Sequence, residues 1–203
     1  MTKLVADIAE AREFLDKNPD IEFIQLVFTN QSGVPRGKNL RRHDLLPIYE
    51  HGRYLPGTML ALDITGEDVD DTGLVWDTGD ADMTARPVAG TLVRAPWLAA
   101  PTGQLMLTMF DGKGQPAAAD PRHALVRVLD GFARQGLTPV VACEIEFYLL
   151  KEEAGGRLVP AGGGRASERQ KIDAYSLTRL DDLAPVFDDV YRAATAQGLP
   201  SSS

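Results

Sequence analysis

The stretch from Thr138 to Leu150 constrains the fold most, because it is a long apolar run interrupted by only two carboxylates. It is rich in β-branched and aromatic residues, contains no glycine and has its single proline near the start, which predicts a β-strand. Side chains alternate between the two faces of a strand, so Glu144 and Glu146 share one face, roughly 6.6 Å apart. Cys143 falls on the opposite face, which is wholly apolar.

Two neighbouring carboxylates on a partly apolar face are costly unless a cation compensates their charge. Carboxylate oxygens are hard ligands of the kind that Mg²⁺ and Mn²⁺ prefer. Glu144 and Glu146 are therefore candidate metal ligands. The alternative is an edge or barrel strand whose glutamates face water or an arginine, and the pattern alone leaves both interpretations open.

Charge and apolar content exclude several classes of protein. The 203 residues carry a formal net charge of −8, and such a field repels the phosphates of nucleic acids and anionic membranes. We find neither an apolar run of transmembrane length nor a signal-peptide pattern, so we expect a cytoplasmic protein of one large or two small domains. The single cysteine, Cys143, cannot form an internal disulfide and is expected in the core.

Residue patterns predict alternating helices and strands in the first half of the chain. Apolar residues recur at helical spacing over residues 2–18, and the strand pattern of residues 21–29 leads into a turn at 30–33. Further along, the patterns predict a short helix over 41–50 and strands over 54–62, 91–94 and 104–110.

Two segments resemble ligand-binding loops but lack the residue spacing or the ligand residues that such loops require. Residues 33–38 resemble a phosphate loop, but the spacing is one residue short and Asn39 stands where a Ser or Thr must bind magnesium. Residues 63–82 are dense in acids and partly match a calcium loop, yet Gly79 stands where the bidentate glutamate belongs. We exclude both sites and expect a solvated, mobile loop over residues 63–82.

A domain boundary is expected around residues 113–119. Asp120, followed by proline, is a strong helix N-cap for a helix over residues 121–135. The glycine- and charge-rich residues 152–171 predict a long flexible insertion. A second helix is expected over residues 181–197.

Several motifs together resemble the glutamine synthetase family, including its γ-glutamyl-polyamine synthetase branch. The resemblance spans most of the chain, and the combination of motifs is more specific than any single one. The matching segments are Ser32-Gly33-Val34-Pro35-Arg36-Gly37-Lys38, Asp80-Ala81-Asp82-Met83 with Arg86-Pro87, Pro96-Trp97, Asp120-Pro121-Arg122 and Glu144-Ile145-Glu146-Phe147-Tyr148-Leu149.

The resemblance implies an α+β fold of two parts. Residues 1–113 would form an N-terminal β-grasp domain, and residues 114–203 would form the incomplete beginning of a catalytic α/β domain. The family also implies a homo-oligomer whose active sites lie between subunits.

The implied activity is an ATP-dependent ligase that joins glutamate to ammonia or a small amine through a γ-glutamyl phosphate. By position, Glu144 and Glu146 match two family ligands of Mg²⁺ or Mn²⁺, and Asp63 matches an aspartate that binds and deprotonates ammonium. Ile64-Thr65-Gly66 replaces the Gly-Ser-Ser that follows this aspartate in bacterial glutamine synthetases. The alternative for Asp63 is a turn residue that caps the backbone.

The family's later metal, substrate and phosphate ligands have no counterpart in these 203 residues. His43, His51 and His123 do not match the metal histidine and are expected on helix or turn surfaces. We therefore expect the chain alone to lack ligase activity. Three hypotheses remain: part of a metal-dependent ATP ligase, a catalytically inactive ligand-binding or assembly module derived from one, or a structural interaction domain.

Overall fold

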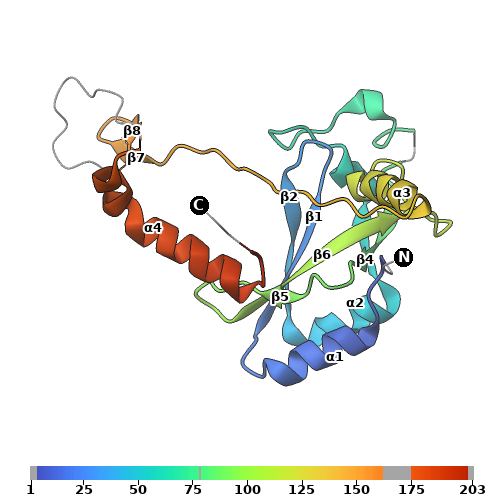
Figure 1. The fold of residues 1–203 in the computed structure, drawn as a ribbon. Coiled ribbons are helices and arrows are strands. Elements are labelled where there is room, and N and C mark those ends of the chain that lie inside the picture. Colours follow the sequence, from blue (N-terminus) through green and yellow to red (C-terminus); the bar gives the residue numbers. More distant parts are fainter. Residues whose placement is uncertain (1–3, 78, 162–174, 201–203) are drawn as a thin grey trace. The chain divides into compact units, whose positions relative to one another are not determined.

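The structure, a computed structural model, describes residues 4–77, 79–161 and 175–200 of a mixed α+β chain (Figure 1). It divides into two compact units, Met1–Pro139 and Val140–Ser203. Each unit is described by itself below. The predicted boundary near residue 113 stays a prediction.

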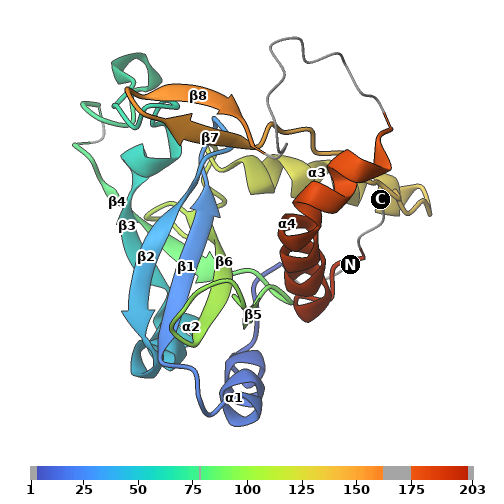
Figure 2. The ribbon, with the colours of Figure 1, turned by 90° about the vertical axis from the view of Figure 1, so that its left-hand side faces the viewer.

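A six-stranded sheet organises the first unit, with strand order β2-β1-β6-β4-β3 and β5 paired to β6 (Figure 2). β1 and β6 run parallel, and the other neighbours in the sheet run antiparallel. The strands are β1 (Phe23–Thr29), β2 (Pro35–Arg41), β3 (Arg53–Pro56), β4 (Asp82–Pro87), β5 (Val93–Arg94) and β6 (Thr102–Phe110).

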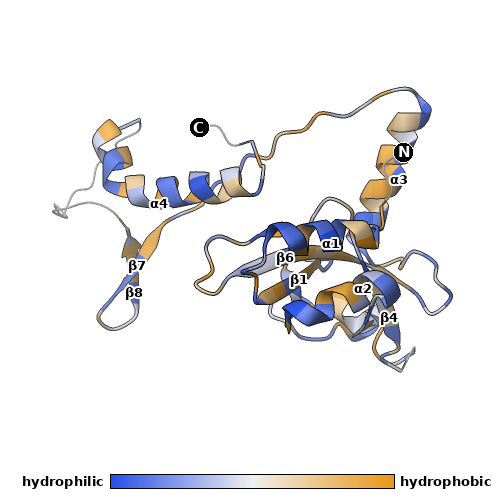
Figure 3. Cartoon of the chain, turned by 90° about the horizontal axis from the view of Figure 1, so that it is seen from below, coloured by the Kyte–Doolittle hydropathy of each residue, from blue (hydrophilic) through white to orange (hydrophobic). Residues whose placement is uncertain are grey.

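One face of this sheet forms the core with two helices, α1 (Ile8–Lys17) and α2 (Leu45–His51). Alternate residues of the two parallel strands are buried, as strand geometry requires: Ile24, Leu26 and Phe28 of β1, and Leu105, Leu107 and Met109 of β6. Both helices carry hydrophilic and hydrophobic residues (Figure 3), and their buried side chains join the same cluster. Burying each such apolar side chain contributes about 1.5–3 kcal/mol.

The predicted helix start at Asp120 is confirmed. Helix α3 runs from Pro121 to Arg134, and the Asp120 side chain accepts a hydrogen bond from the backbone N–H of Arg122. The apolar side chains that the helical spacing identified are exposed on α3 within its unit, namely Leu125, Val128, Leu129 and Phe132.

The predicted strand Thr138–Leu150 is wrong for most of its length. Residues 138–149 belong to no strand, and only Leu150 enters β7 (Leu150–Glu153), which pairs with β8 (Arg157–Pro160). The residue pattern favours a strand, but a strand forms only where its backbone N–H and C=O groups pair with a neighbour. Cys143 is consequently exposed, which corrects its expected place in the core.

Other differences are smaller. The predicted strand over residues 54–62 ends at Pro56 and continues as a 3₁₀ turn, Gly57–Leu60. The expected flexible insertion begins as the β7–β8 hairpin, whose turn uses the positive φ angles of Gly155 and Gly156. Residues 162–174 of the same prediction lie outside the described residues. The predicted second helix is confirmed as α4 (Leu177–Ala196).

None of the helices that the structure describes combines the length and apolarity needed to cross a membrane.

Candidate functional site

The Asp63 side chain holds the loop that follows it. Its Oδ1 atom accepts hydrogen bonds from the Thr65 hydroxyl at 2.7 Å and from the backbone N–H groups of Gly66 and Glu67 at 2.8 and 2.9 Å. Gly66 closes this turn with a φ of +96°, which glycine adopts without strain. The capping interpretation of Asp63 is therefore confirmed, and its predicted catalytic role stays a prediction.

The same hydrogen bonds stabilise the ionised form of Asp63. The Thr65 hydroxyl, followed by the Glu67 N–H, lowers the pKa of this carboxyl below its ordinary value. Asp63 as a residue is half-buried, and its Oδ2 atom has no hydrogen-bond partner among the described residues. Asp63 thus offers one free, negatively charged oxygen at neutral pH.

Two side chains from the β1–β2 hairpin anchor the backbone at Asp63. Arg36 Nη2 donates to the Asp63 carbonyl oxygen at 3.1 Å, and Asn30 Nδ2 donates to the Leu62 carbonyl oxygen at 3.0 Å. Asn30 is only 1% exposed. Its Oδ1 atom accepts from the N–H groups of Ser32 and Val34, so one amide fixes both the hairpin turn and the start of the Asp63 loop.

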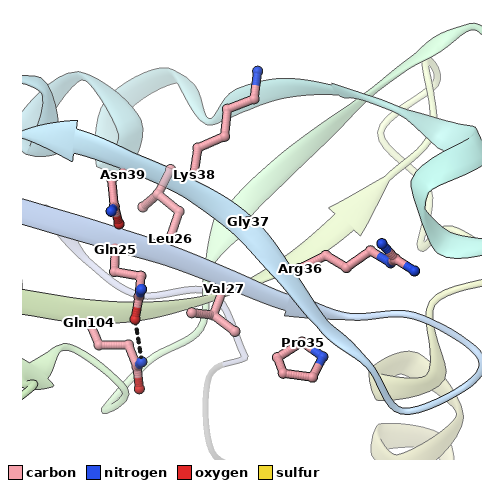
Figure 4. Close-up of a pocket in the computed structure, with 9 residues that line it drawn as sticks. All are labelled: Gln25, Leu26, Val27, Pro35, Arg36, Gly37, Lys38, Asn39 and Gln104. Carbon is pink, nitrogen blue, oxygen red and sulfur yellow. Dashed lines mark hydrogen bonds between the residues drawn. The ribbon is translucent and has the colours of Figure 1, made fainter. Parts of the chain in front are cut away.

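Residues 35–38 of the segment that resembled a phosphate loop lie in strand β2 (Figure 4). It pairs antiparallel with β1, and a Cβ atom added at Gly37 would lie 1.7 Å from the carbonyl oxygen of Leu26. The glycine therefore serves close strand packing, and the exclusion of a phosphate loop is confirmed. The adjoining pocket of about 400 Å³ is lined by Gln104 and Gln25, and Gln104 Nε2 donates a hydrogen bond of 2.7 Å to Gln25 Oε1. The Arg36 side chain points away from this pair (Figure 4).

A second, more apolar cavity of about 680 Å³ lies beside Asp63. Apolar residues make up most of its lining, including Leu62, Leu74, Met83 and Ala119, and Asp63 and Asp111 also line it. One wall is fixed by Gln31, whose Nε2 donates to the Ala119 carbonyl oxygen at 2.6 Å.

Further along the acidic segment, residues Asp70–Thr72 form a 3₁₀ turn. Trp76 Nε1 donates to Asp70 Oδ1 at 2.8 Å, although the indole is 76% exposed. No group of three His, Cys, Asp or Glu side chains suited to a metal ion occurs in the part of the chain that the structure describes.

Glu144 and Glu146 lie on the extended stretch of the second unit, and both are exposed. Glu146 lines a cavity of about 530 Å³ together with Phe147, Leu183 and Phe187, whereas Glu144 does not. Their oxygens suit Mg²⁺ or Mn²⁺ chemically, but two carboxylates without a third described ligand fall short of a complete site. Their assignment as metal ligands stays a prediction.

A buried polar cluster joins α3 to β6. The sequence patterns did not predict it. Asp120 Oδ2 accepts from the Thr108 hydroxyl at 2.8 Å and from the Met109 N–H at 2.7 Å. His123 Nε2 lies 2.7 Å from the Met109 carbonyl oxygen, and because a carbonyl only accepts, this nitrogen carries a proton. His123 is 3% exposed, which corrects its expected surface position. His43 and His51 are exposed, as expected.

Comparisons with known proteins place these residues in a family. The model of the glutamine synthetase catalytic domain matches residues 118–203. Gamma-glutamylputrescine synthetase PuuA of Escherichia coli is 34% identical over 197 residues, covering 95% of this chain and 41% of the relative. The chain belongs to the glutamine synthetase family.

Other glutamine synthetase family members match a smaller share of the chain. Gamma-glutamylethanolamide synthetase GlnA4 of Streptomyces coelicolor is 32% identical, covering 66% of this chain and 29% of the relative. Glutamine synthetase of Pyrococcus abyssi is 29% identical, covering 87% of this chain and 35% of the relative. The chain thus spans about two fifths or less of the length of these relatives.

Solved structures agree with the family fold. Ligand-free GmaS matches with a TM-score of 0.59 at 21% identity, covering 91% of this chain and 39% of that structure. The GmaS/ADP complex in conformation 1 matches with a TM-score of 0.56 at 22% identity, covering 96% of this chain and 39% of that structure. At these identities the likeness concerns the fold alone.

Proposed function

We propose that the chain is part of an ATP-dependent ligase that joins the side-chain carboxylate of glutamate to ammonia or a small amine through a γ-glutamyl phosphate. Family membership and the two γ-glutamyl-amine synthetases among the relatives support a glutamate–amine ligase. The observation that carries the proposal is Asp63, a carboxylate held in place through one oxygen while the other stays available.

Asp63 acts on the nitrogen substrate. Amines are ammonium ions at neutral pH, and an ionised carboxylate attracts and orients such a cation. Because the Thr65 and Glu67 hydrogen bonds keep the pKa of Asp63 low, this residue holds a cation well and is a weak proton acceptor. Its main contribution is to position the ammonium ion, and its acidity limits its part in removing the proton.

Glu144 and Glu146 would hold Mg²⁺ or Mn²⁺, which supplies charge neutralisation for phosphoryl transfer between two anions. Their hard oxygen donors and their spacing along an extended backbone support this role. The remaining ligands of the ions and of ATP would come from elsewhere in the complete assembly.

We also propose that residues 1–113 form a β-grasp domain and residues 114–203 the start of the catalytic domain. The mixed sheet with its parallel β1–β6 pair, packed against α1, supports the first assignment. The match of residues 118–203 to the catalytic-domain model supports the second. Active sites would form between the subunits of a homo-oligomer.

The test is phosphate release by the full-length gene product that contains these residues. We expect release that requires ATP, glutamate, Mg²⁺ or Mn²⁺ and an amine, with the γ-glutamyl amide identified by mass spectrometry. The 203-residue chain alone should be inactive. A full-length product that assembles and binds amine, yet forms no amide with ammonia or any of a panel of amines, would overturn the proposal in favour of an inactive binding or assembly module.

A further inference from the structure

Strand β2 forms one edge of the six-stranded sheet, and in the part of the chain that the structure describes it pairs with β1 alone. Hydrogen bonding alternates along such a strand, because successive residues point their backbone groups to opposite sides. At one end of the hairpin, the Asn30 N–H donates to the Val34 carbonyl oxygen at 3.3 Å. At the other end, the Arg42 N–H donates to the Glu22 carbonyl oxygen at 3.0 Å. The even-numbered residues of β2 therefore bond to β1.

The odd-numbered residues of β2 point their backbone groups to the free edge of the sheet. Gly37 and Asn39 each offer an N–H and a carbonyl oxygen there, and Pro35 offers a carbonyl oxygen. None of these groups has a hydrogen-bond partner among the described residues. The Arg41 N–H donates to Asp44 Oδ2 at 3.3 Å, which ends the free stretch. Within its unit, the sheet can accept one more strand at this edge.

The free edge of β2 is positively charged in an otherwise acidic chain. Residues 33–43 contain four lysine or arginine residues and no aspartate or glutamate, whereas the whole chain carries a net charge of −8. Arg36 and Arg42 donate to backbone carbonyl groups of their own unit. Lys38 and Arg41 are exposed, and the Lys38 ammonium has no hydrogen-bond partner among the described residues. Both of these charges can reach a carboxylate of a partner.

This charge determines which kind of strand fits the free edge. Lysine on an edge strand opposes pairing with a like strand. Antiparallel pairing of two β2 strands would set Arg36, Lys38 and Arg41 of one copy against the same residues of the other. Like charges directly opposite each other destabilise a pair of strands, and opposite charges stabilise it. The edge therefore favours an acidic strand over a second copy of β2.

A pocket of about 400 Å³ opens beside Gly37, on the face of the sheet where the Asn39, Gln25 and Gln104 side chains lie (Figure 4). Gly37 lines the pocket without filling it, because glycine has no side chain. Cβ atoms of residues directly opposite each other on neighbouring strands lie about 5 Å apart. A large apolar side chain opposite Gly37 on an added strand would therefore lie at the pocket, where Val27 adds apolar surface.

We propose that the free edge of β2 binds an extended acidic segment of a partner protein, which joins the sheet as a seventh strand. Its backbone bonds to Gly37 and Asn39, and its carboxylates face Lys38 and Arg41. One large apolar side chain enters the pocket beside Gly37. Main-chain hydrogen bonds give such strand addition its affinity, and alternate side chains give it its specificity. The inference does not depend on the proposed ligase activity.

The test is hydrogen exchange by NMR on the 203-residue chain, with the acetylated and amidated peptide Glu-Val-Thr-Glu-Phe-Glu-Thr as the probe. In antiparallel pairing, this peptide places its glutamates opposite Arg41, Lys38 and Arg36 and its phenylalanine opposite Gly37. At a peptide concentration of about ten times the Kd, we expect exchange of the Gly37 and Asn39 amides to slow about tenfold.

Protection of these two amides distinguishes strand addition from loose binding to the charged side chains. A peptide with lysine in place of each glutamate should leave the Gly37 and Asn39 amides unprotected. An acidic peptide that fails to bind, or that binds without slowing exchange of these amides, would overturn the inference. Equal protection by the two peptides would overturn it as well. Protection of both amides in a self-associated chain without peptide would show that a second copy occupies the edge, again overturning the inference.

Lys38→Glu is the diagnostic variant, because it reverses the charge at the centre of the free edge. Reversal removes an attraction and adds a repulsion, so we expect the acidic peptide to bind about three- to tenfold more weakly. Lys113→Glu is the matched control, since it makes the same change of net charge at an exposed residue outside β2. Screening at about 0.1 M salt should keep its effect below about twofold. Equal weakening by the two variants would contradict binding at this edge.

Asn39→Pro tests the backbone bonds of the added strand. The Asn39 N–H points away from β1, and proline is tolerated on an edge strand at such a position. The urea midpoint should stay in place, while the peptide should no longer protect the Gly37 amide. Full protection of Gly37 in a folded Asn39→Pro variant would show that the peptide does not pair with β2. Lys38→Glu supplies the decisive comparison if Asn39→Pro does not fold.

Discussion

Arg36 Nη2 donates a hydrogen bond of 3.1 Å to the carbonyl oxygen of Asp63, 27 residues further along the chain. This contact ties strand β2 to the loop that carries the candidate catalytic carboxylate. A long-range bond of this kind fixes the loop without using the Asp63 side chain, whose cap is made by its own neighbours. Strand and loop together hold the carboxylate in place.

Replacing Arg36 by alanine should loosen the Asp63 loop and leave global stability nearly unchanged. The Nε atom of Arg36 is buried without a hydrogen-bond partner among the described residues, a cost of about 1–3 kcal/mol that disappears with the side chain. Hydrogen exchange of the Gly66 and Glu67 amides should accelerate while the urea midpoint stays in place. Lys38→Ala, an exposed residue of the same strand, is the control, and equal exchange in the two variants would contradict the anchoring role.

Gly37→Ala should destabilise the first unit. The new Cβ would approach the Leu26 carbonyl oxygen to 1.7 Å, a backbone atom that cannot move aside cheaply. Overpacking of this kind costs about 1–3 kcal/mol. Gly112→Ala meets no atom within 4 Å and should be nearly neutral. Urea denaturation of both variants measures the difference, and equal midpoints would show that β1 and β2 are further apart than described.

Thr108→Val removes the hydroxyl that donates to Asp120 and keeps the shape of the side chain. Asp120 Oδ2 then retains only the Met109 N–H, and we expect a loss of about 1–3 kcal/mol for a buried polar group left underpaired. Thr84→Val on β4 removes a hydroxyl with no hydrogen-bond partner among the described residues and should cost less. A Thr108→Val variant as stable as the unsubstituted chain would mean that the cluster does not hold α3 on β6.

The ion pair between Asp20 and Arg94 predicts an acid-dependent contribution to stability. Hydrogen bonds from Arg94 to both oxygens of Asp20, at 2.9 and 2.6 Å, lower the pKa of Asp20 to about 2. Because the folded-state pKa lies below the unfolded value of about 3.9, the contribution is present above about pH 4 and is lost as the pH falls toward 2.

Asp20→Asn should remove this part of the acid dependence, whereas Asp16→Asn on the exposed side of α1 should keep it. Carbon-detected NMR titration of the Asp20 carboxyl measures its pKa directly. A value near 3.9 would show that the pair is open in solution.

Local signals in the sequence predicted local structure well. Asp120 followed by proline identified the start of α3, because a cap depends only on adjacent residues. The burial of His123 escaped prediction, since its partners Thr108 and Met109 lie on a strand more than ten residues away. The Thr138–Leu150 pattern correctly indicated apolar character and wrongly indicated a paired strand, because pairing depends on a partner that the pattern does not specify.

In the candidate site, too, the sequence predicted local features and did not predict long-range contacts. Sequence alone identified Asp63 as a turn cap or a catalytic carboxylate, and the structure adds the anchors Asn30 and Arg36 that no spacing rule connects to it. Glu144 and Glu146 were selected from their alternation, and their metal-binding role stays a prediction.

The central claim is that Asp63 binds the amine that receives the glutamyl group. The measurement that tests it most directly is steady-state kinetics of the full-length gene product carrying Asp63→Asn, with Asp71→Asn as the control. Asparagine keeps the loop cap but loses the charge that positions the ammonium ion, so we expect kcat/KM for the amine to fall about 10²-fold. The KM for glutamate and ATP should stay unchanged. An Asp63→Asn enzyme that uses amines as efficiently as the Asp71→Asn control would contradict the account.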